Sequence, residues 1–165
     1  MQLYIKQKVF SWRDRFTVKD RAGNDRYFVE GKLLTLARTL TVCDEQGRAV
    51  AQIHRKVFSW RPRYYLEVGG QTYQLVRKLT LFRPSFYVEG LPWQMEGDFL
   101  GHDYAVTEGL NVILRLSKYW FAWGDSYELD IADPANELLC LCIALGVDCM
   151  QADADGRINK ISDLF

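Results

Sequence analysis

Six basic residues recur at matching positions and are the clearest candidates for a chemical role in this sequence. The segment KVFSWR occurs at residues 8–13 and again at 56–61, and a related segment spans 78–83. Cations beside interfacial aromatic side chains, such as Trp12 and Trp60, suit an anionic membrane surface. We therefore predict that anionic phospholipid, for example phosphoinositide head groups, binds a basic arc formed by Lys8, Arg13, Lys56, Arg61, Lys78 and Arg83.

The charge distribution supports two interpretations of this arc. Residues 1–90 contain 17 Lys and Arg against 8 Asp and Glu (17 − 8 = +9), whereas residues 91–165 contain 4 against 13 (4 − 13 = −9). Such asymmetry indicates a basic face for an anionic partner. The simpler interpretation, which the sequence favours, is a solvated rim whose cations pair with acidic residues of the second half. Arg15 and Arg63 occupy further matching positions in two of the copies.

Residues that could perform catalysis are scarce. The chain has only two histidines, His54 and His102, and we assign each a structural or surface role. Ser11 and Ser59 occupy corresponding repeat positions, which indicates turn chemistry rather than a nucleophile. No nucleophile elbow, phosphate-binding loop or dinucleotide fingerprint is present. We therefore predict neither an enzyme nor a cofactor.

Two segments resemble metal sites but have the wrong spacing. Cys140 and Cys142 would point about 200° apart on a helix, which does not suit zinc. Residues 151–162 resemble a calcium loop, but Gln151 and Ser162 stand where ligating residues are needed. No metal is predicted. Because three of the four cysteines lie in one apolar run, we expect reduced thiols in an intracellular protein.

The basic residues belong to a sequence repeat that predicts the fold. Each copy has an aromatic residue or leucine, a short polar turn, and an apolar residue four places later that starts a new strand. Six copies cover about residues 3–131, with FLGHDY at 99–104 as a degenerate one, and two strands per copy give about twelve antiparallel strands. A sheet of that length closes into a barrel. The anchor positions are Trp12, Leu36, Trp60, Phe82 and Trp123.

A buried helix is predicted to follow the barrel strands. Asp133 suits the helix N-cap and Pro134 the first helical position. Residues 138–147 are apolar on every side, so this helix, about 134–150, must be surrounded. A twelve-stranded barrel has a lumen too wide for side chains alone to fill. We therefore predict one domain, residues 1–150, with the helix inside the barrel, and a polar tail at 151–165.

The order of several segments resembles a known family. KQKVFSW, FTVKD, GK, LPWQMEGDF and YWFAWGDSYELDI, followed by an apolar terminal helix, are similar to the LURP-one-related (YxjI-like) family. The resemblance covers residues 1–150 and implies the Tubby C-terminal fold, a twelve-stranded barrel around a central hydrophobic helix. It also implies kinship with phosphoinositide-binding Tubby-like domains and with phospholipid scramblases. No match to the lysine–arginine pocket of the phosphoinositide-binding members is found, and fold does not carry function.

Three classes of function remain, in this order. The first is a non-enzymatic module that binds anionic lipid through the basic arc. The second is a protein-interaction or scaffold domain without lipid affinity, and the third is a small-ligand protein or an enzyme. No motif supports nucleic acid as a partner. With no signal peptide and no apolar run long enough to span a bilayer, we expect a cytoplasmic protein that is peripheral at a membrane surface.

Overall fold

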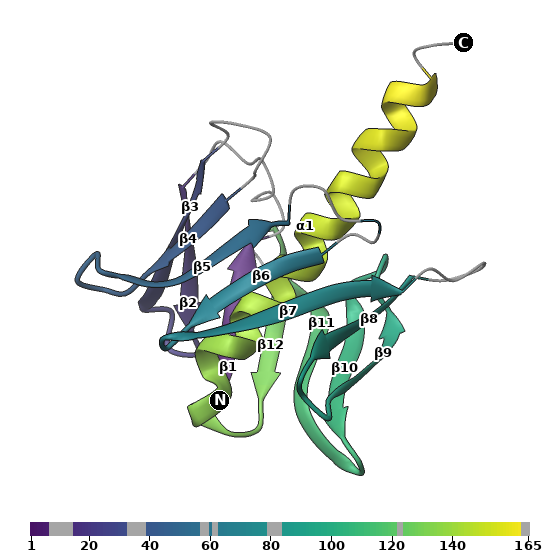
Figure 1. Ribbon diagram of the computed structural model, residues 1–165. Coiled ribbons are helices and arrows are strands. Elements are labelled where there is room, and N and C mark those ends of the chain that lie inside the picture. The colour runs from purple at the N-terminus through teal and green to yellow at the C-terminus, as the bar shows by residue number, and fades with distance from the viewer. Residues whose placement is uncertain are drawn as a thin grey trace.

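The structure, a computed structural model, is a closed antiparallel barrel of twelve strands around one C-terminal helix (Figure 1). It describes residues 1–6, 15–32, 39–56, 60, 63–78, 84–121 and 124–162. Each strand pairs with the next along the chain, and β1 pairs with β12 to close the barrel. The strands are β1 (Gln2–Lys6), β2 (Arg15–Asp20), β3 (Asp25–Lys32), β4 (Thr39–Cys43), β5 (Ala49–Arg55), β6 (Arg63–Val68), β7 (Gln71–Lys78), β8 (Ser85–Glu89), β9 (Gln94–Asp98), β10 (Asp103–Glu108), β11 (Asn111–Phe121) and β12 (Gly124–Ile131).

The strands form because apolar and polar residues alternate along them. In β6, Tyr64 and Leu66 are 1% and 0% exposed, whereas the intervening Tyr65 is only half-buried. The closing register aligns Leu3 with Leu129, both fully buried. A slip of one residue would turn these apolar side chains outward, so the inner face fixes the register. The predicted fold class is therefore confirmed, and glycine-containing turns at 21–24, 44–48, 69–70 and 109–110 join successive strands.

The helix begins as the sequence predicts. The side chain of Asp133 accepts a hydrogen bond of 2.9 Å from the backbone N–H of Ala135, and Pro134 opens a short 3-10 helix, η2 (Pro134–Asn136). The α-helix α1 (Glu137–Ser162) follows directly. A proline at this position loses little, because its missing N–H would have no partner within the helix.

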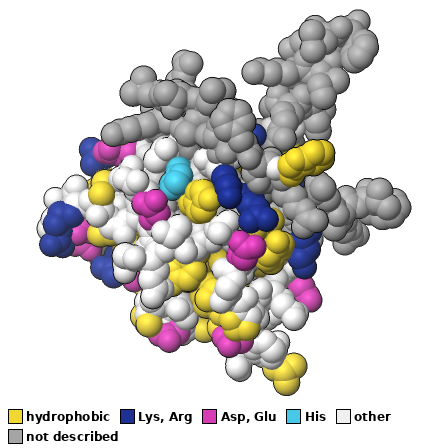
Figure 2. Space-filling view, in the orientation of Figure 1, with side chains coloured by type: hydrophobic (Ala, Val, Ile, Leu, Met, Phe, Trp, Pro, Cys, Tyr) yellow, Lys and Arg dark blue, Asp and Glu magenta, His cyan; other side chains and the backbone are white. Residues whose placement is uncertain are grey.

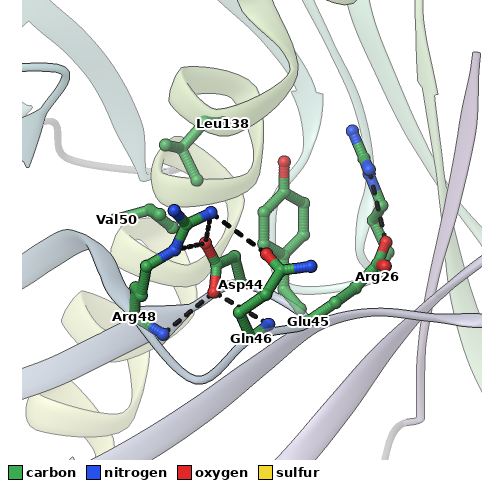
Figure 3. A pocket seen from close by; sticks show the side chains of 8 residues that line it. Arg26, Asp44, Glu45, Gln46, Arg48, Val50 and Leu138 are labelled. Carbon is green, nitrogen blue, oxygen red and sulfur yellow. Dashed lines mark hydrogen bonds and ion pairs between the residues drawn. The ribbon is translucent and has the colours of Figure 1, made fainter.

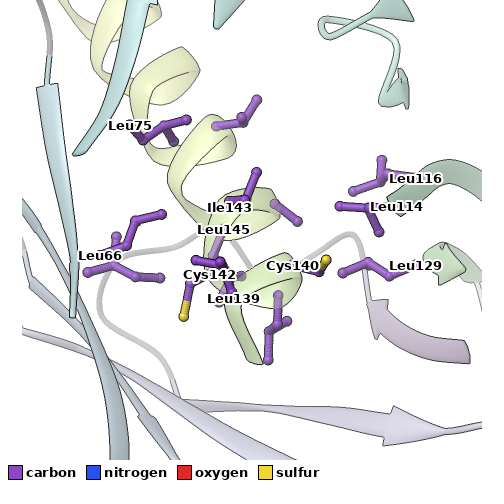
Figure 4. Packing of buried hydrophobic residues seen from close by; sticks show 14 of the residues in the cluster. Leu66, Leu75, Leu114, Leu116, Leu129, Leu139, Cys140, Cys142, Ile143 and Leu145 are labelled. Atoms are coloured by element: carbon purple, nitrogen blue, oxygen red, sulfur yellow. The ribbon is translucent and has the colours of Figure 1, made fainter. Parts of the chain in front are cut away.

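The barrel wall surrounds the first half of α1. All residues from Leu139 to Gln151 are at most 8% exposed. Leu66 and Leu75 lie on one side of the helix, and Leu114, Leu116 and Leu129 lie on the other (Figure 4). A helix that is apolar all round is stable only when it is enclosed in this way. The predicted buried helix is therefore present.

The wall approaches the helix most closely at Gly146. A Cβ atom at this position would lie 2.8 Å from Leu75 Cδ2 and 3.3 Å from Leu66 Cδ2. Glycine inside a helix costs about 1 kcal/mol relative to alanine. At Gly146 the absence of a side chain compensates this cost, because it lets Leu66 of β6 and Leu75 of β7 pack against the helix backbone.

The helix continues to Ser162, beyond the predicted end near residue 150. No proline interrupts residues 151–162, and Asp153 on this extension remains 6% exposed. The Asp153 carboxylate accepts a hydrogen bond of 2.9 Å from the Tyr64 hydroxyl group and lies 3.5 Å from Arg55. These contacts with β5 and β6 hold the extended part of the helix at the rim of the barrel. The segment that resembles a calcium loop is therefore helical.

By length and composition, the stretch Pro134–Ala154 is apolar enough to cross a membrane. However, 78% of its most apolar part is buried inside the barrel, as in the core helix of many soluble proteins. Withdrawal of this helix would expose the apolar inner face of the wall, so its burial explains its composition without a bilayer.

Candidate functional site

One rim of the barrel carries two of the six residues that the sequence predicted as a site, Lys56 and Lys78. Strands β5 and β7 end there, and β6 and β8 begin there. Lys8, Arg13, Arg61 and Arg83 lie outside the described residues, so the predicted arc is placed only in part.

Lys56 and Lys78 occupy equivalent positions above two tyrosines. The Lys56 ammonium group lies 5.6 Å from the centroid of the Tyr65 ring, and that of Lys78 lies 5.4 Å from the centroid of the Tyr87 ring. Ammonium groups at this distance are attracted by the negative face of an aromatic ring. Within the described part of the chain, no carboxylate forms an ion pair with either lysine. Neither lysine charge is therefore balanced by a carboxylate of the described residues.

Trp60 lies in the connection between β5 and β6, near Lys56 in the chain. Its exposed fraction, 103%, is that of a side chain with no covering contact. Full exposure excludes a place in the core for this anchor residue of the repeat. Tryptophan is enriched at interfaces, where one end of its ring is apolar and the other is polar.

Arg63 also belongs to this rim. It faces outward opposite Val76, and its Nη1 atom lies 3.2 Å from Gln74 Oε1 and 3.4 Å from Glu89 Oε2. Its charge is thus partly balanced by Glu89, unlike those of the two lysines. We call the outer surface formed by these residues the rim patch, and it comprises Lys56, Trp60, Arg63, Tyr65, Lys78 and Tyr87.

Acidic residues border the patch. His54 Nε2 lies 3.0 Å from Glu67 Oε1, and the imidazole packs on Tyr65 with the ring centroids 5.2 Å apart. On the face shown in Figure 2, Lys and Arg side chains (dark blue) lie close to acidic side chains (magenta) and a histidine (cyan). Some of the charge at this rim is therefore paired, as that of Arg63 is with Glu89. The partners of Arg63 and His54, however, come from residues 63–89 rather than from the acidic second half.

The sequence did not predict that the rings of Tyr65 and Tyr87 would lie against the two lysines. The signal was present, because each follows its turn at a similar distance, Tyr65 in RPRYY and Tyr87 in RPSFY. Their strand neighbours Tyr64 and Phe86 point into the barrel, so alternation turns Tyr65 and Tyr87 outward toward the lysines. The contact between each tyrosine and its lysine could be inferred only once the pairing register of the strands was known.

A hollow of about 310 Å³ lies at the opposite rim, beside the start of α1. Its lining includes Arg26, Asp44, Arg48 and Leu138 (Figure 3). Both guanidinium groups already contact carboxylates, Arg48 with Asp44 at 2.7 Å and Arg26 with Glu137 at 2.9 Å. Both arginine charges that line this hollow are therefore balanced within the protein.

Among the described residues, no group of three or more histidine, cysteine or acidic side chains could hold a metal ion. The four cysteines, Cys43, Cys140, Cys142 and Cys149, are buried. Burial raises the pKa of Cys140 to about 12 and also raises that of Cys142, so neither is a reactive thiolate near neutral pH.

The chain matches the model of one protein family, described as LURP-one-related, over residues 1–148. It belongs to the LURP-one-related family. This LURP-one-related chain is 37% identical over 149 residues to the uncharacterised protein YxjI of Bacillus subtilis (strain 168), covering 90% of this chain and 92% of YxjI. The family resemblance expected from the motifs is thus confirmed.

The fold of this LURP-one-related chain also has a solved counterpart. The X-ray structure of the Arabidopsis thaliana protein AT5G01750 aligns with a TM-score of 0.56 over 90% of each chain, at 13% sequence identity. At this identity the likeness concerns the fold alone. Neither relative carries a named activity, so the function has to be argued from the rim patch.

Proposed function

We propose that this protein is a non-enzymatic binding module that docks on an anionic phospholipid surface through the rim patch. One observation carries the proposal. Lys56 and Lys78 stand at the same rim with no carboxylate partner in the described part of the chain, and the fully exposed Trp60 lies in the same region. The membership of the LURP-one-related family is compatible with this function but does not supply it.

The chemistry of the patch fits the interface between water and lipid. A lysine close to an anionic leaflet contributes about 1 kcal/mol to binding. A tryptophan places its apolar ring among the acyl chains while its indole N–H stays near the head groups. The rings of Tyr65 and Tyr87, against which the lysines lie, add apolar surface to the patch. Charge and aromatic surface together favour a membrane over a soluble anion, which would need only the charge.

Arg63 gives the patch a fixed element. Its contacts with Gln74 and Glu89 hold the guanidinium group in place, whereas the lysine ammonium groups sit on flexible stems. Such a surface is suited to head groups that vary in position. We therefore assign it general affinity for anionic phospholipid, with phosphoinositides as the more highly charged examples.

A protein-interaction domain is the second candidate function. An exposed tryptophan flanked by cations also suits an acidic protein surface, since aromatic residues and arginine are enriched in interfaces. In that case the patch would show no affinity for vesicles. The single experiment below separates the two candidates.

The test is co-sedimentation with vesicles of phosphatidylcholine, with and without phosphatidylserine or a phosphatidylinositol phosphate, at low and at physiological salt. The proposal predicts binding that requires the anionic lipid and weakens as salt screens the charges. The double variant Lys56→Gln/Lys78→Gln should lose most of this binding.

Lys19→Gln is the control, because it removes one lysine charge at the other rim, half of the charge that the double variant removes. Lys19 is 44% exposed and pairs with Asp25, next to the turn at 21–24. The Lys19→Gln variant should bind vesicles as strongly as the natural sequence does. Absence of binding at low salt would contradict the proposal, and so would an equal loss in the control, which would indicate nonspecific attraction.

A further inference from the structure

The turn between β9 and β10, residues 99–102, rests on the central helix. Phe99 is 3% exposed, and its backbone carbonyl accepts a hydrogen bond of 2.7 Å from Gln151 Nε2 on α1. At the other end of the turn, His102 Nε2 lies 2.8 Å from Asp148 Oδ1, also on α1. The turn therefore contacts the helix at two points, one neutral and one charged.

The backbone of this turn is held in an unfavourable conformation. His102 has φ = 56°, and it is the one residue other than glycine with positive φ in the described part of the chain. Just before the turn, Gly97 has φ = 134°, and a Cβ atom there would lie 2.5 Å from the Asp103 carbonyl oxygen. A side-chain-bearing residue in the left-handed region persists only where its surroundings impose it. For His102, those surroundings are the contact with Asp148 and a stack on Tyr127, with ring centroids 4.4 Å apart.

Asp148 lies inside the barrel, where an unbalanced charge is costly. It is 6% exposed, and His102 is the only partner with which it forms an ion pair among the described residues. The contact is short but does not have hydrogen-bond geometry, so its strength depends on charge. The hydroxyl group of Tyr104, also buried, has no hydrogen-bond partner in the described part of the chain.

The other titratable groups near this pair cannot replace the imidazole. Burial raises the pKa of Tyr104 on β10 well above its ordinary value and raises that of Cys140 on α1 to about 12, so neither carries a charge near pH 7. Tyr127 on β12 stacks on His102, and Asp98 and Asp103 lie beside the turn. Burial raises the pKa of Asp148, and the neighbouring His102 acts in the opposite direction. The arrangement thus contains one buried carboxyl group and one group able to compensate it.

We propose that His102 and Asp148 form a pH-sensitive latch that fastens the β9–β10 turn to the central helix. The pair holds one proton, whether this resides on the imidazole or on the carboxyl group. Loss of that proton leaves an uncompensated carboxylate in the barrel, and the turn then loses the interaction that balances its unfavourable backbone. The latch is closed when the pair is protonated and opens when it is not. This inference does not depend on lipid binding.

The direction of the pH effect follows from proton linkage. In an unfolded chain an aspartic acid releases its proton near pH 3.9, whereas burial raises the pKa of Asp148 in the folded protein. The folded state therefore binds more protons than the unfolded state above about pH 3.9, so stability falls as the pH rises. The stabilising effect of this group is complete below about pH 3.9 and is lost as the pH rises through the folded-state pKa of Asp148.

Amide hydrogen exchange at pH 6 and pH 8, corrected for intrinsic rates, measures the latch directly. The reporters are the N–H of Gly101, which bonds to Asp98 Oδ1 at 2.9 Å, and that of His102, which bonds to the Phe99 carbonyl at 3.3 Å. In the natural sequence, their protection should be high at pH 6 and fall at pH 8. The melting temperature should shift downward over the same interval.

Three variants complete the experiment. His102→Asn keeps a residue that tolerates the left-handed region but removes the imidazole, so protection should already be low at pH 6. Asp148→Asn removes the buried carboxyl group and its titration, so protection should be equal at the two pH values. His54→Asn removes the other histidine, which is paired with Glu67 on the outer surface, and should behave like the natural sequence.

The proposal is overturned by equal protection at the two pH values in the natural sequence. It is equally overturned if the fall persists in Asp148→Asn or disappears in His54→Asn, because another group would then be titrating. Should His102→Asn fail to fold, the contrast between Asp148→Asn and His54→Asn still decides the matter, since the two predictions are opposite.

Discussion

Glu137, the first residue of α1, receives two parallel hydrogen bonds from Arg26 on β3. Nε donates to Oε1 at 2.9 Å and Nη2 donates to Oε2 at 3.0 Å. The Glu137 carboxylate is 9% exposed and also lies at the helix N-terminus, where negative charge is favourable. The bonds with Glu137 raise the pKa of the Arg26 guanidinium group further above its ordinary value. This fork fixes the depth at which the helix enters the barrel.

Replacement of Arg26 by Met should therefore lower the free energy of unfolding by about 1–2 kcal/mol, because Glu137 is left without its paired donors. Arg26 is partly exposed, so water compensates some of the loss. Urea denaturation near pH 7 measures the change. Arg48→Met is the control, since Arg48 is 75% exposed and pairs with Asp44 at the surface, and it should cost less than about 0.5 kcal/mol. Equal effects in the two variants would contradict a special role for the Arg26–Glu137 pair.

The enclosed helix makes a second prediction. Leu141 and Leu145 are fully buried, so Leu141→Asp or Leu145→Asp places an unpaired carboxyl group in the barrel and should cost several kcal/mol, roughly 3 or more. That is enough to unfold a domain of ordinary stability. Circular dichroism melting measures the loss. Leu110, at the β10–β11 turn, is 102% exposed, so Leu110→Asp should leave the melting temperature nearly unchanged. A Leu141→Asp protein that melts like the natural sequence would show that the helix is not enclosed.

The four cysteines provide a third prediction. All are buried, and burial raises the pKa of Cys140 to about 12, so almost no Cys140 thiolate is present at pH 8. Because reagents cannot reach buried sulfur atoms, an aromatic disulfide reagent should label none of the four rapidly in the folded protein. After reduction, removal of the reductant and unfolding in denaturant, the same reagent should detect all four. Rapid labelling of Cys140, Cys142 or Cys149 in the folded protein would mean that the helix leaves the barrel on the timescale of the assay.

Much of the fold could be predicted because its signals are local. Alternation identifies a strand such as β6, the glycine-containing turn at 44–48 separates β4 from β5, and Asp133 with Pro134 starts the helix. The apolar run around Leu141 then requires an enclosure, and the strand count supplies one. Each of these inferences uses residues that are close together in the chain. The end of α1 was less predictable, because the contact of Asp153 with Tyr64 that extends it joins distant segments.

The candidate site could be predicted less completely for the same reason. The repeated lysines indicate a shared rim, but not that Lys56 stands over Tyr65 or that Glu89 engages Arg63. Those contacts depend on which face of each strand is turned outward. Similarly, a structural role could be assigned to His102, but its partner Asp148 becomes visible only when the helix is inside the barrel.

The most direct test of membrane docking is the depth of Trp60 in a bilayer. Tryptophan fluorescence should be measured with anionic vesicles whose acyl chains carry bromine, a quencher that acts only at short range. The account predicts quenching that disappears in Trp60→Phe and persists in Trp93→Phe, since Trp93 is 8% exposed within the barrel wall. Quenching that is absent, or that is unchanged by the loss of Trp60, would show that the rim patch does not face the membrane.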